Sequence, residues 1–435
     1  MTFNSWMNSI ADAGRDLLGR YKGGRDEKDI NALCADLCSN KGEAMGTALA
    51  CAVVNAYHLM DESAQLTFFQ FLVSDYSVSQ SALIDCAEVY KAEPSQANLE
   101  ALKKAVESPR QALFRRINMS PTGTPTLVAM RADLQNYLKE YEELRAVDSD
   151  LKQLLETWFN RGFLKIRTIN WQTPAHILEK LIAYEAVHAM NGWEDLRRRL
   201  EDDRRCFAFF HPALKDEPLI FVEVALTTGL ATKVQPLLAA RTKTDLKHAE
   251  DTAIFYSISN CQAGLKGITF GNFLIKQVVM ELREELPHLT QFSTLSPIPT
   301  FGRWLMKELE NSESRLISSE ERVVIEKIEA PDWHLDANLS DSLKQLMMRL
   351  GAHYLHNEKR GVAPLDPVAR FHLGNGACLE QLNWMGDVST NGLAQSSGML
   401  VNYLYKLNSV EENHEAYVND NIVARSKSFA ALLSV

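Results

Sequence analysis

An apolar run, a turn with two glycines and a second apolar run follow one another between residues 253 and 279. The first run, Ala253–Ser259, is typical of a buried strand, and the second continues as a helix through Phe273–Val279. Another strand-like run, His288–Thr294, comes after the helix. A strand, a helix and a strand in this order predict a right-handed crossover within a sheet.

The turn between the first strand and the helix has features of an anion site. Glycines let backbone N–H groups approach a ligand, and the first amides of a helix have no intrahelical partner, so a phosphate can satisfy them. The pattern is neither GxxxxGK[ST] nor GxGxxG, and it resembles the coenzyme A turn of GNAT-type acetyltransferases. Taken alone, it fits a glycine-permitted strand-to-helix connection better than a ligand site. The candidate binding residues are Lys266, Gly267, Ile268, Thr269, Phe270, Gly271 and Asn272.

The chain changes character near residue 150. Before that point, alanine, leucine and glutamate are frequent, and apolar residues recur at helical spacing, as at Leu134, Leu138 and Tyr141. After it, further elements are expected: a hairpin at 206–212 and 218–226, a helix at 340–356, and late strands at 379–384 and 399–405. We predict an α+β protein with an all-helical N-terminal bundle at 1–152, followed by an α/β domain with a mixed sheet at 153–435.

Charge and composition exclude several classes of protein. The net charge of −10 argues against nonspecific nucleic-acid binding, and no apolar run is long enough to span a bilayer. The seven cysteines and the lack of a recognisable secretion signal indicate reduced thiols and a cytoplasmic location. Cys34 and Cys38 have no second pair at zinc-finger spacing, so we expect two packed residues one helical turn apart.

Other candidate groups have simple structural interpretations. A serine before proline, such as Ser296, is usually an extended or turn residue, and a lone histidine such as His372 is usually packed. His353 and His356 lack an obvious third ligand, so no metal site is predicted. Glu223 is unusual inside an apolar strand, and three interpretations stay open: it faces solvent, pairs with an arginine or lines a pocket. The clusters at 197–199 and 204–205 are most simply charges on a helix face.

Several longer segments together resemble the malonyl-CoA decarboxylase family. The similarity covers most of the chain after about residue 150 and is thinner before it. The segments that carry it are Phe210–Thr227, Phe255–Ser259, Gly264–Lys276, Phe292–Pro299, Phe371–Ala377, Asn383–Ser389 and Met399–Tyr403.

The resemblance implies a helical assembly domain, a GNAT-like catalytic domain and a homo-oligomer that is a dimer of dimers. It implies conversion of malonyl-CoA to acetyl-CoA and carbon dioxide, with no metal or organic cofactor. The family's catalytic serine and histidine fall on Ser296 and His372, an active-site tyrosine falls on Tyr405, and its coenzyme A turn falls on 266–272. The family often has Gln and Glu where this chain has Lys266 and Thr269. Some members form disulfides between subunits, but Cys206 alone lies near such a position and no bridge is assumed.

The chemistry of a malonyl thioester suits these residue types. Its own carbonyl accepts the electrons of the breaking bond, so the enzyme must stabilise an enolate oxygen and protonate carbon. We expect Ser296 to orient the carboxylate, and His372 to stabilise the thioester oxygen or transfer the proton. Two alternatives are a GNAT-type acetyltransferase and a noncatalytic acyl-CoA-binding interaction protein.

Overall fold

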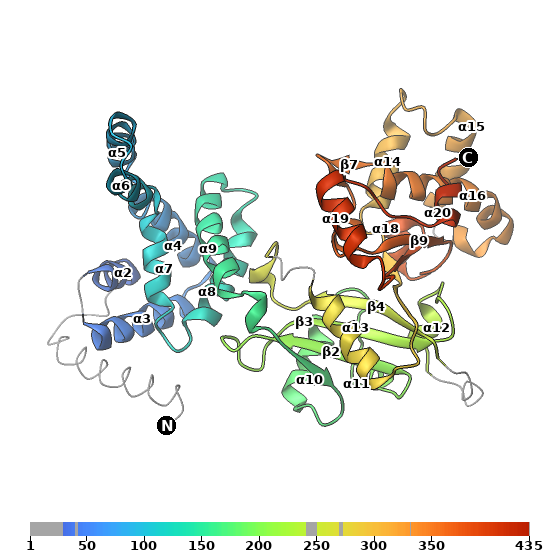
Figure 1. The fold of residues 1–435 in the computed structure, drawn as a ribbon, viewed down its shortest axis with the longest axis horizontal. Coiled ribbons are helices and arrows are strands. Elements are labelled where there is room, and N and C mark those ends of the chain that lie inside the picture. Colours follow the sequence, from blue (N-terminus) through green and yellow to red (C-terminus); the bar gives the residue numbers. More distant parts are fainter. Residues whose placement is uncertain (1–28, 40–41, 241–249, 269–272, 331, 435) are drawn as a thin grey trace. The chain divides into compact units, whose positions relative to one another are not determined.

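The computed structural model describes the chain except for residues 1–28, 40–41, 241–249, 269–272, 331 and 435 (Figure 1). It divides into two compact units. Unit 1 comprises the chain up to Leu164, together with His211–Asp216 and a segment that begins at Gln262. Unit 2 comprises Lys165–Phe210, Glu217–Cys261 and the chain from residue 271 onward. The boundary expected at residue 152 stays a prediction.

Unit 1 is helical where the structure describes it, as the sequence pattern predicts. Serine and aspartate begin several of its helices, since the side chains of Asp61 and Ser95 accept hydrogen bonds from amides of the first turn. Buried Cys34 and half-buried Cys38 share the first described helix. The helices are α2 (Ile30–Cys38), α3 (Glu43–His58), α4 (Glu62–Asp75), α5 (Gln80–Ala92), α6 (Gln96–Val106), α7 (Pro109–Ile117), α8 (Gly123–Tyr137) and α9 (Arg145–Trp158), with short 3-10 turns η1 (Glu142–Leu144), η2 (Arg161–Phe163) and η3 (Ala263–Leu265).

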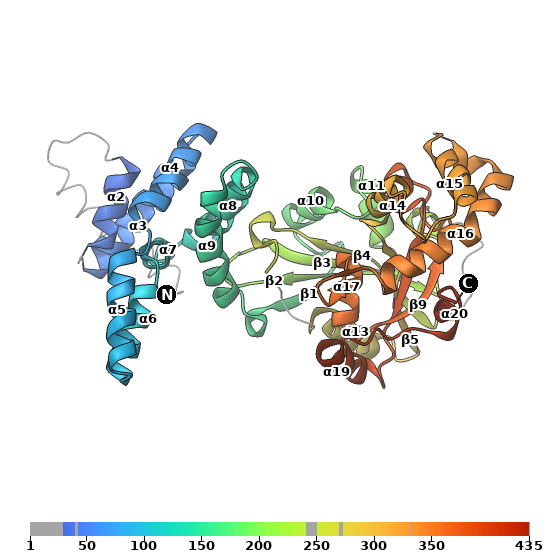
Figure 2. The same ribbon diagram turned by 90° about the horizontal axis from the view of Figure 1, so that it is seen from above.

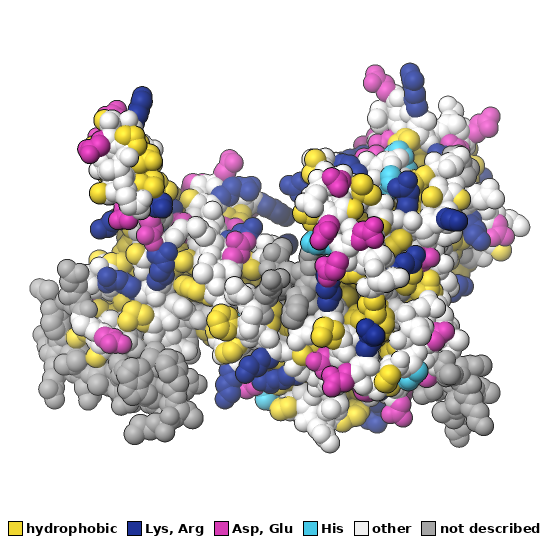
Figure 3. Space-filling view, viewed as in Figure 1, with side chains coloured by type: hydrophobic (Ala, Val, Ile, Leu, Met, Phe, Trp, Pro, Cys, Tyr) yellow, Lys and Arg dark blue, Asp and Glu magenta, His cyan; other side chains and the backbone are white. Residues whose placement is uncertain are grey.

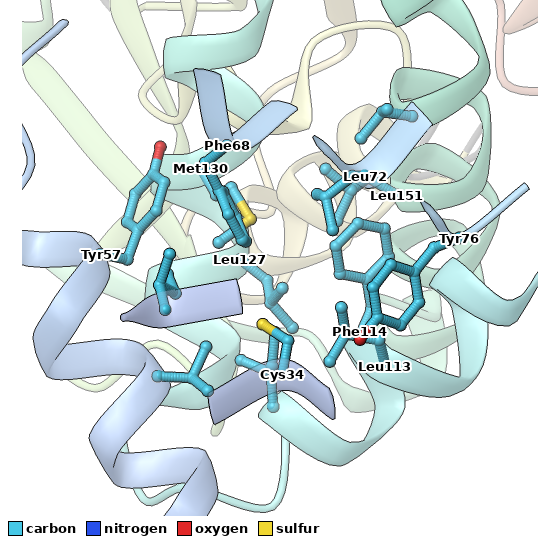
Figure 4. Close-up of a cluster of buried hydrophobic side chains, with 14 of the residues drawn as sticks. Cys34, Tyr57, Phe68, Leu72, Tyr76, Leu113, Phe114, Leu127, Met130 and Leu151 are labelled. Atoms are coloured by element: carbon cyan, nitrogen blue, oxygen red, sulfur yellow. The ribbon is translucent and has the colours of Figure 1, made fainter. Parts of the chain in front are cut away.

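The core of unit 1 is formed by apolar side chains from six of these helices. Removal of such side chains from water is the main force that holds helices together. Figure 4 shows the centre of this core, in which aromatic rings and branched side chains from α2, α3, α4, α7, α8 and α9 meet. The labelled members include Cys34, Tyr57, Phe68, Leu72, Leu113, Phe114, Leu127, Met130 and Leu151.

Helices α5 and α6 contribute nothing to this core. They form a hairpin in which no residue is buried. Ile84, Val89 and Val106 are more than half exposed, and Figure 3 shows hydrophobic side chains along the projecting hairpin. A helix pair that leaves apolar residues in water is a candidate contact surface.

Unit 2 is built on one mixed sheet, as expected. In the part of the chain that the structure describes, eight strands form this sheet in the order β1-β2-β3-β4-β5-β10-β6, with β9 paired to β10. Strands β2, β3 and β4 are antiparallel neighbours, whereas β4 and β5 are parallel. The strands are β1 (Lys165–Ile169), β2 (Arg204–Phe210), β3 (Pro218–Thr227), β4 (Thr252–Asn260), β5 (Gln291–Thr294), β6 (Ser296–Pro297), β9 (Cys378–Asn383) and β10 (Leu400–Leu404); β7 (Lys359–Arg360) and β8 (Ala363–Pro364) pair separately.

Helices cover both faces of this sheet. Figure 2 shows α13, the crossover between β4 and β5, on the opposite side of the strands from α10 and α11. The expected α+β fold is therefore confirmed. The helices are α10 (Ala175–Tyr184), α11 (Trp193–Arg199), α12 (Gln235–Leu238), α13 (Phe273–Glu285), α14 (Phe301–Glu310), α15 (Ser319–Ile325), α16 (Ala337–His356), α17 (Pro367–Gly374), α18 (Thr390–Ser396), α19 (Val410–Asp420) and α20 (Lys427–Ala431), with 3-10 turns η4 (Glu326–Glu329) and η5 (Trp333–Leu335).

The interpretation of the arginine clusters as helix-face charges is wrong for four of the five residues, since Arg204 and Arg205 lie on β2, and Arg198 and Arg199 of α11 are buried. Arg198, Arg199 and Arg204 are at most 7% exposed. Arg199 Nε lies 3.5 Å from the carboxylate of Glu223, which is fully buried on β3. A carboxyl group inside a sheet needs a partner, so the short helix α11 turns its arginine inward. Of the readings considered for Glu223, pairing with an arginine is the correct one.

Glu223 makes the stability of unit 2 depend on pH. Burial raises its pKa to about 8, against the lowering effect of the Arg199 charge; Glu185 adds to the rise, whereas the nearby Tyr256 hydroxyl and the Arg204 charge oppose it. The unfolded chain therefore releases this proton at a lower pH than the folded chain. The stabilisation is fully present below about pH 4.5 and is lost as pH rises through about 8.

We expect Glu223→Gln to abolish this dependence. Relative to the variant, the wild-type free energy of unfolding should fall between pH 5 and 8, by at most about 1.4 kcal/mol per pH unit. Urea denaturation of both proteins at several pH values measures the difference. A difference that stays constant across this range would show that Glu223 is ionised in the folded protein.

Candidate active site

Ser296 and Thr294 face the same way because of the geometry of an extended chain. Side chains two residues apart in a strand lie on one face, and Leu295 between them points to the opposite, apolar face. The hydroxyl of Ser296 donates a hydrogen bond to Thr294 Oγ1 over 2.9 Å. Strand β10 fixes this segment, since Val401 pairs with Ser296.

Helix α17 brings His372 to the same place. Pro367 at the first helical position and the preceding Asp366 set where the helix begins. The Asp366 carboxylate accepts hydrogen bonds from the amides of Val368 and Ala369, each over 2.9 Å. One turn later, His372 Nε2 lies 3.3 Å from Ser296 Oγ.

Strand β10 and the residue after it supply two tyrosines on one face. The hydroxyl of Tyr405 lies 2.8 Å from His372 Nδ1. The ring of Tyr403 stacks on the imidazole, with centroids 4.6 Å apart and planes inclined by 25°. Tyr405, His372, Ser296 and Thr294 thus form one hydrogen-bonded series, which we call the buried row.

The buried row is electrically neutral near pH 7. Each of its members is at most 6% exposed. Burial lowers the pKa of His372 to about 3, because an imidazolium ion loses its hydration there. Burial also raises the pKa of Tyr405 well above its usual value, so its hydroxyl stays protonated. The site offers hydrogen-bond donors and acceptors without a fixed charge.

The structure therefore brings together the three candidate catalytic residues, Ser296, His372 and Tyr405, although their catalytic roles stay predictions. Sequence reasoning missed Thr294 and Tyr403. Both could have been found by one signal, since each stands two residues before a candidate residue in a predicted strand.

The described residues of the candidate anion turn, 266–268, belong to unit 1. Gly267 has a positive φ of 76°, a conformation that favours glycine, and the space beside its Cα is open. Buried Arg131 of α8 donates hydrogen bonds to the carbonyls of Gly264 and Lys266, over 2.7 and 3.0 Å, and pairs with Asp148. Sequence reasoning missed this arginine. Thr269, Phe270, Gly271 and Asn272 lie outside the described residues.

The histidines considered as metal ligands have other partners. His353 contacts Glu358 and Asn357, and His356 contacts Arg425. Over the described ranges of the chain, no group of three or more His, Cys, Asp or Glu side chains is arranged to hold a metal ion.

Two family models match the chain. Residues 162–435 match the C-terminal domain of malonyl-CoA decarboxylase, and residues 76–159 match its N-terminal domain. The mitochondrial malonyl-CoA decarboxylase of Anser anser anser is 38% identical over 350 residues, which are 74% of this chain and 69% of the relative. The Rattus norvegicus protein of the same name is 35% identical over 359 residues, covering 77% of this chain and 73% of the relative.

Solved structures agree with these matches. The crystal structure of malonyl-CoA decarboxylase from Rhodopseudomonas palustris superposes with a TM-score of 0.89 at 45% identity, covering 95% of this chain and all of that one. The enzyme from Agrobacterium vitis gives 0.86 at 45% identity, over 93% and 100% of the two chains. The helices that the structure describes include none with the length and apolarity needed to cross a bilayer.

Proposed function

Because the chain belongs to the malonyl-CoA decarboxylase family, we propose that it converts malonyl-CoA to acetyl-CoA and carbon dioxide at the buried row. The observation that carries this proposal is the juxtaposition of Tyr405, His372 and Ser296 in a dry, neutral site. Dry surroundings strengthen each hydrogen bond to a developing charge.

Neutral groups suit this reaction. As the bond to the carboxylate breaks, its electrons move to the thioester oxygen, and a donor aimed at such an oxyanion is worth about 2.7–4 kcal/mol. A cation held against the carboxylate would stabilise the substrate more than the transition state and so raise the barrier. Ser296 can orient the carboxylate without that effect. His372 stabilises the thioester oxygen or transfers the proton, and Tyr405 fixes its ring.

No metal or organic cofactor is needed in this scheme, because the substrate's own carbonyl accepts the electrons. Coenzyme A arrives as part of the substrate. We expect the turn at 266–272 to bind its pyrophosphate. Two observations support this assignment: Gly267 has a left-handed backbone conformation, and buried Arg131 binds the carbonyls of Gly264 and Lys266 just before it.

The turn is tested by Gly271→Val. A branched side chain in the turn should block the phosphates, so we expect the dissociation constant of coenzyme A to rise about tenfold or more. Isothermal titration calorimetry measures the affinity. Val106→Ala, a small change on the exposed hairpin, is the control. Unchanged affinity with a folded variant would remove the turn from the binding site.

The reaction is tested by incubating the pure protein with malonyl-CoA and no acceptor. We expect carbon dioxide and acetyl-CoA in equal amounts. Succinyl-CoA is the control, because its carboxylate is one carbon too far for the thioester carbonyl to accept the electrons. An acetyltransferase would not react without an amine acceptor, and a noncatalytic acyl-CoA-binding protein would not react at all. The absence of carbon dioxide release would therefore overturn the proposal.

We also propose that the protein is a homo-oligomer, a dimer of dimers located in the cytoplasm. The exposed apolar residues of the α5–α6 hairpin support the assembly.

Ile84→Glu combined with Val89→Glu should lower the mass of the assembly, measured by light scattering, because charges would replace apolar contacts between subunits. Leu59→Glu is the control, since Leu59 is 88% exposed and lies outside the hairpin. A monomeric wild-type protein, or an unchanged mass in the double variant, would contradict the proposed role of the hairpin.

A further inference from the structure

Thr294 ends the buried row and is held rigidly. It is fully buried, and its Oγ1 accepts two hydrogen bonds, from the Ser296 hydroxyl and, over 3.1 Å, from the backbone N–H of Tyr403. Its carbonyl oxygen accepts from Asn402 Nδ2 over 2.7 Å. Asn402 is itself fixed by Asn383, which donates to its Oδ1 over 2.7 Å. The acceptor presented to Ser296 therefore has a fixed position.

This acceptor decides where the protons of the row lie. A hydroxyl carries one proton, and that of Ser296 points to Thr294. At the contact with His372 Nε2, Ser296 Oγ is then left to accept, so Nε2 must carry the hydrogen. A neutral imidazole has one N–H, which leaves Nδ1 bare. The Tyr405 hydroxyl donates to it over 2.8 Å.

The opposite tautomer of His372, with the hydrogen on Nδ1, leaves more hydrogen-bonding groups without a partner. If Nδ1 carried the hydrogen, Ser296 would have to turn its proton from Thr294 to His372. The Tyr405 hydroxyl would become an acceptor, and its own proton would lose its partner. Within the described residues, the hydrogen bond to His372 is the one that this hydroxyl makes. A buried donor without a partner is costly.

We propose that Thr294 is a positioning residue that selects the Nε2–H tautomer of His372, so that the imidazole acts on the acyl group as a hydrogen-bond donor. This inference rests on the proposed function and narrows it. It assigns His372 to the thioester oxygen rather than to proton delivery, and Ser296 to holding the imidazole N–H rather than to donating to the carboxylate. The contact to Ser296 is long at 3.3 Å, so the same N–H is available to a substrate oxygen.

The electrons and protons balance without a charged histidine. The electron pair of the bond to the carboxylate moves into the enolate, and carbon dioxide leaves. His372 keeps its N–H and shares it with the enolate oxygen. The carbon then takes one proton from a water molecule, and a proton from solvent neutralises the hydroxide. The low pKa of His372 agrees with a group that stays neutral.

The tautomer is measured directly by NMR of the whole protein labelled with ¹⁵N-histidine, with His372→Gln used to assign the signal. In the wild type we expect a protonated Nε2 and a bare Nδ1 at His372. A wild-type protein with hydrogen on Nδ1 would overturn the proposal whatever the variants do.

Two substitutions test whether the hydroxyl of Thr294, rather than the shape of its side chain, selects the tautomer. Thr294→Val keeps the shape and removes the acceptor, so Nδ1–H should appear and kcat should fall about 10- to 100-fold, with KM changed less than about threefold. Thr294→Ser keeps the acceptor and should restore both the wild-type tautomer and most of kcat. An unchanged tautomer in Thr294→Val would refute the positioning role. The tautomer is read by NMR without any reaction, so it can be tested even if the wild type does not turn over malonyl-CoA. A wild type without turnover would overturn the proposed function, and a wrong tautomer would overturn this inference.

Discussion

His372→Ala should lower kcat for malonyl-CoA about 10²- to 10³-fold, the usual effect of removing one donor to an oxyanion. The reason is that the imidazole N–H is the donor that we assign to the thioester oxygen, and the ring is held between Ser296 and Tyr405. Binding of coenzyme A should not change, because the turn assigned to its pyrophosphate is a separate segment. Steady-state kinetics and calorimetry measure the two quantities.

The control is His288→Ala, which removes an exposed histidine from the same unit. It should leave kcat unchanged. Equal losses of kcat in the two variants would mean that the buried row has no special role. A lower affinity for coenzyme A in His372→Ala would place the histidine near the coenzyme A part of the substrate instead of the acyl group.

Ser296→Ala should lower kcat about 10- to 100-fold, because the imidazole of His372 loses the acceptor of its N–H. The hydroxyl donates to Thr294 and accepts from His372, so it holds the imidazole N–H that we assign to the thioester oxygen. The variant also leaves Thr294 and His372 without their common partner, so the imidazole should lose its fixed orientation. Rates of carbon dioxide release measure the effect.

Ser293→Ala is the matched control for this change. Ser293 is also a buried serine, on β5, but its hydroxyl contacts the backbone carbonyls of Thr294 and Tyr403 and no side chain of the row. We expect a nearly unchanged kcat in this variant. A rate in Ser296→Ala equal to that of Ser293→Ala would exclude Ser296 from the chemistry.

Local patterns were sufficient to predict the central strands of the sheet. The apolar runs that begin near residues 206, 218 and 253 predicted β2, β3 and β4, because strands buried on both faces read as continuous hydrophobic stretches. The arginines of α11 were misjudged because only the local pattern was used. Nothing within that helix shows that Arg199 faces a carboxylate on β3, although the buried Glu223 required such a partner.

The site was found through the family resemblance, since spacing alone could not join Ser296 to His372, 76 residues later. Long-range contacts depend on how β10 lies between β5, β6 and β9, which no local pattern encodes. The supporting residues were within reach, because alternation in a strand places Thr294 beside Ser296 and Tyr403 beside Tyr405. Asp366 was also missed, although a carboxylate before proline is a common start of a helix.

The most direct test of the account is the rate of carbon dioxide release from malonyl-CoA by the wild type, Ser296→Ala, His372→Ala and the double variant. Groups that act as a unit show non-additive losses. We predict stoichiometric release by the wild type, and a double variant within about threefold of the slower single variant. No release by the wild type, or a loss in the double variant equal to the product of the two single losses, would contradict the account.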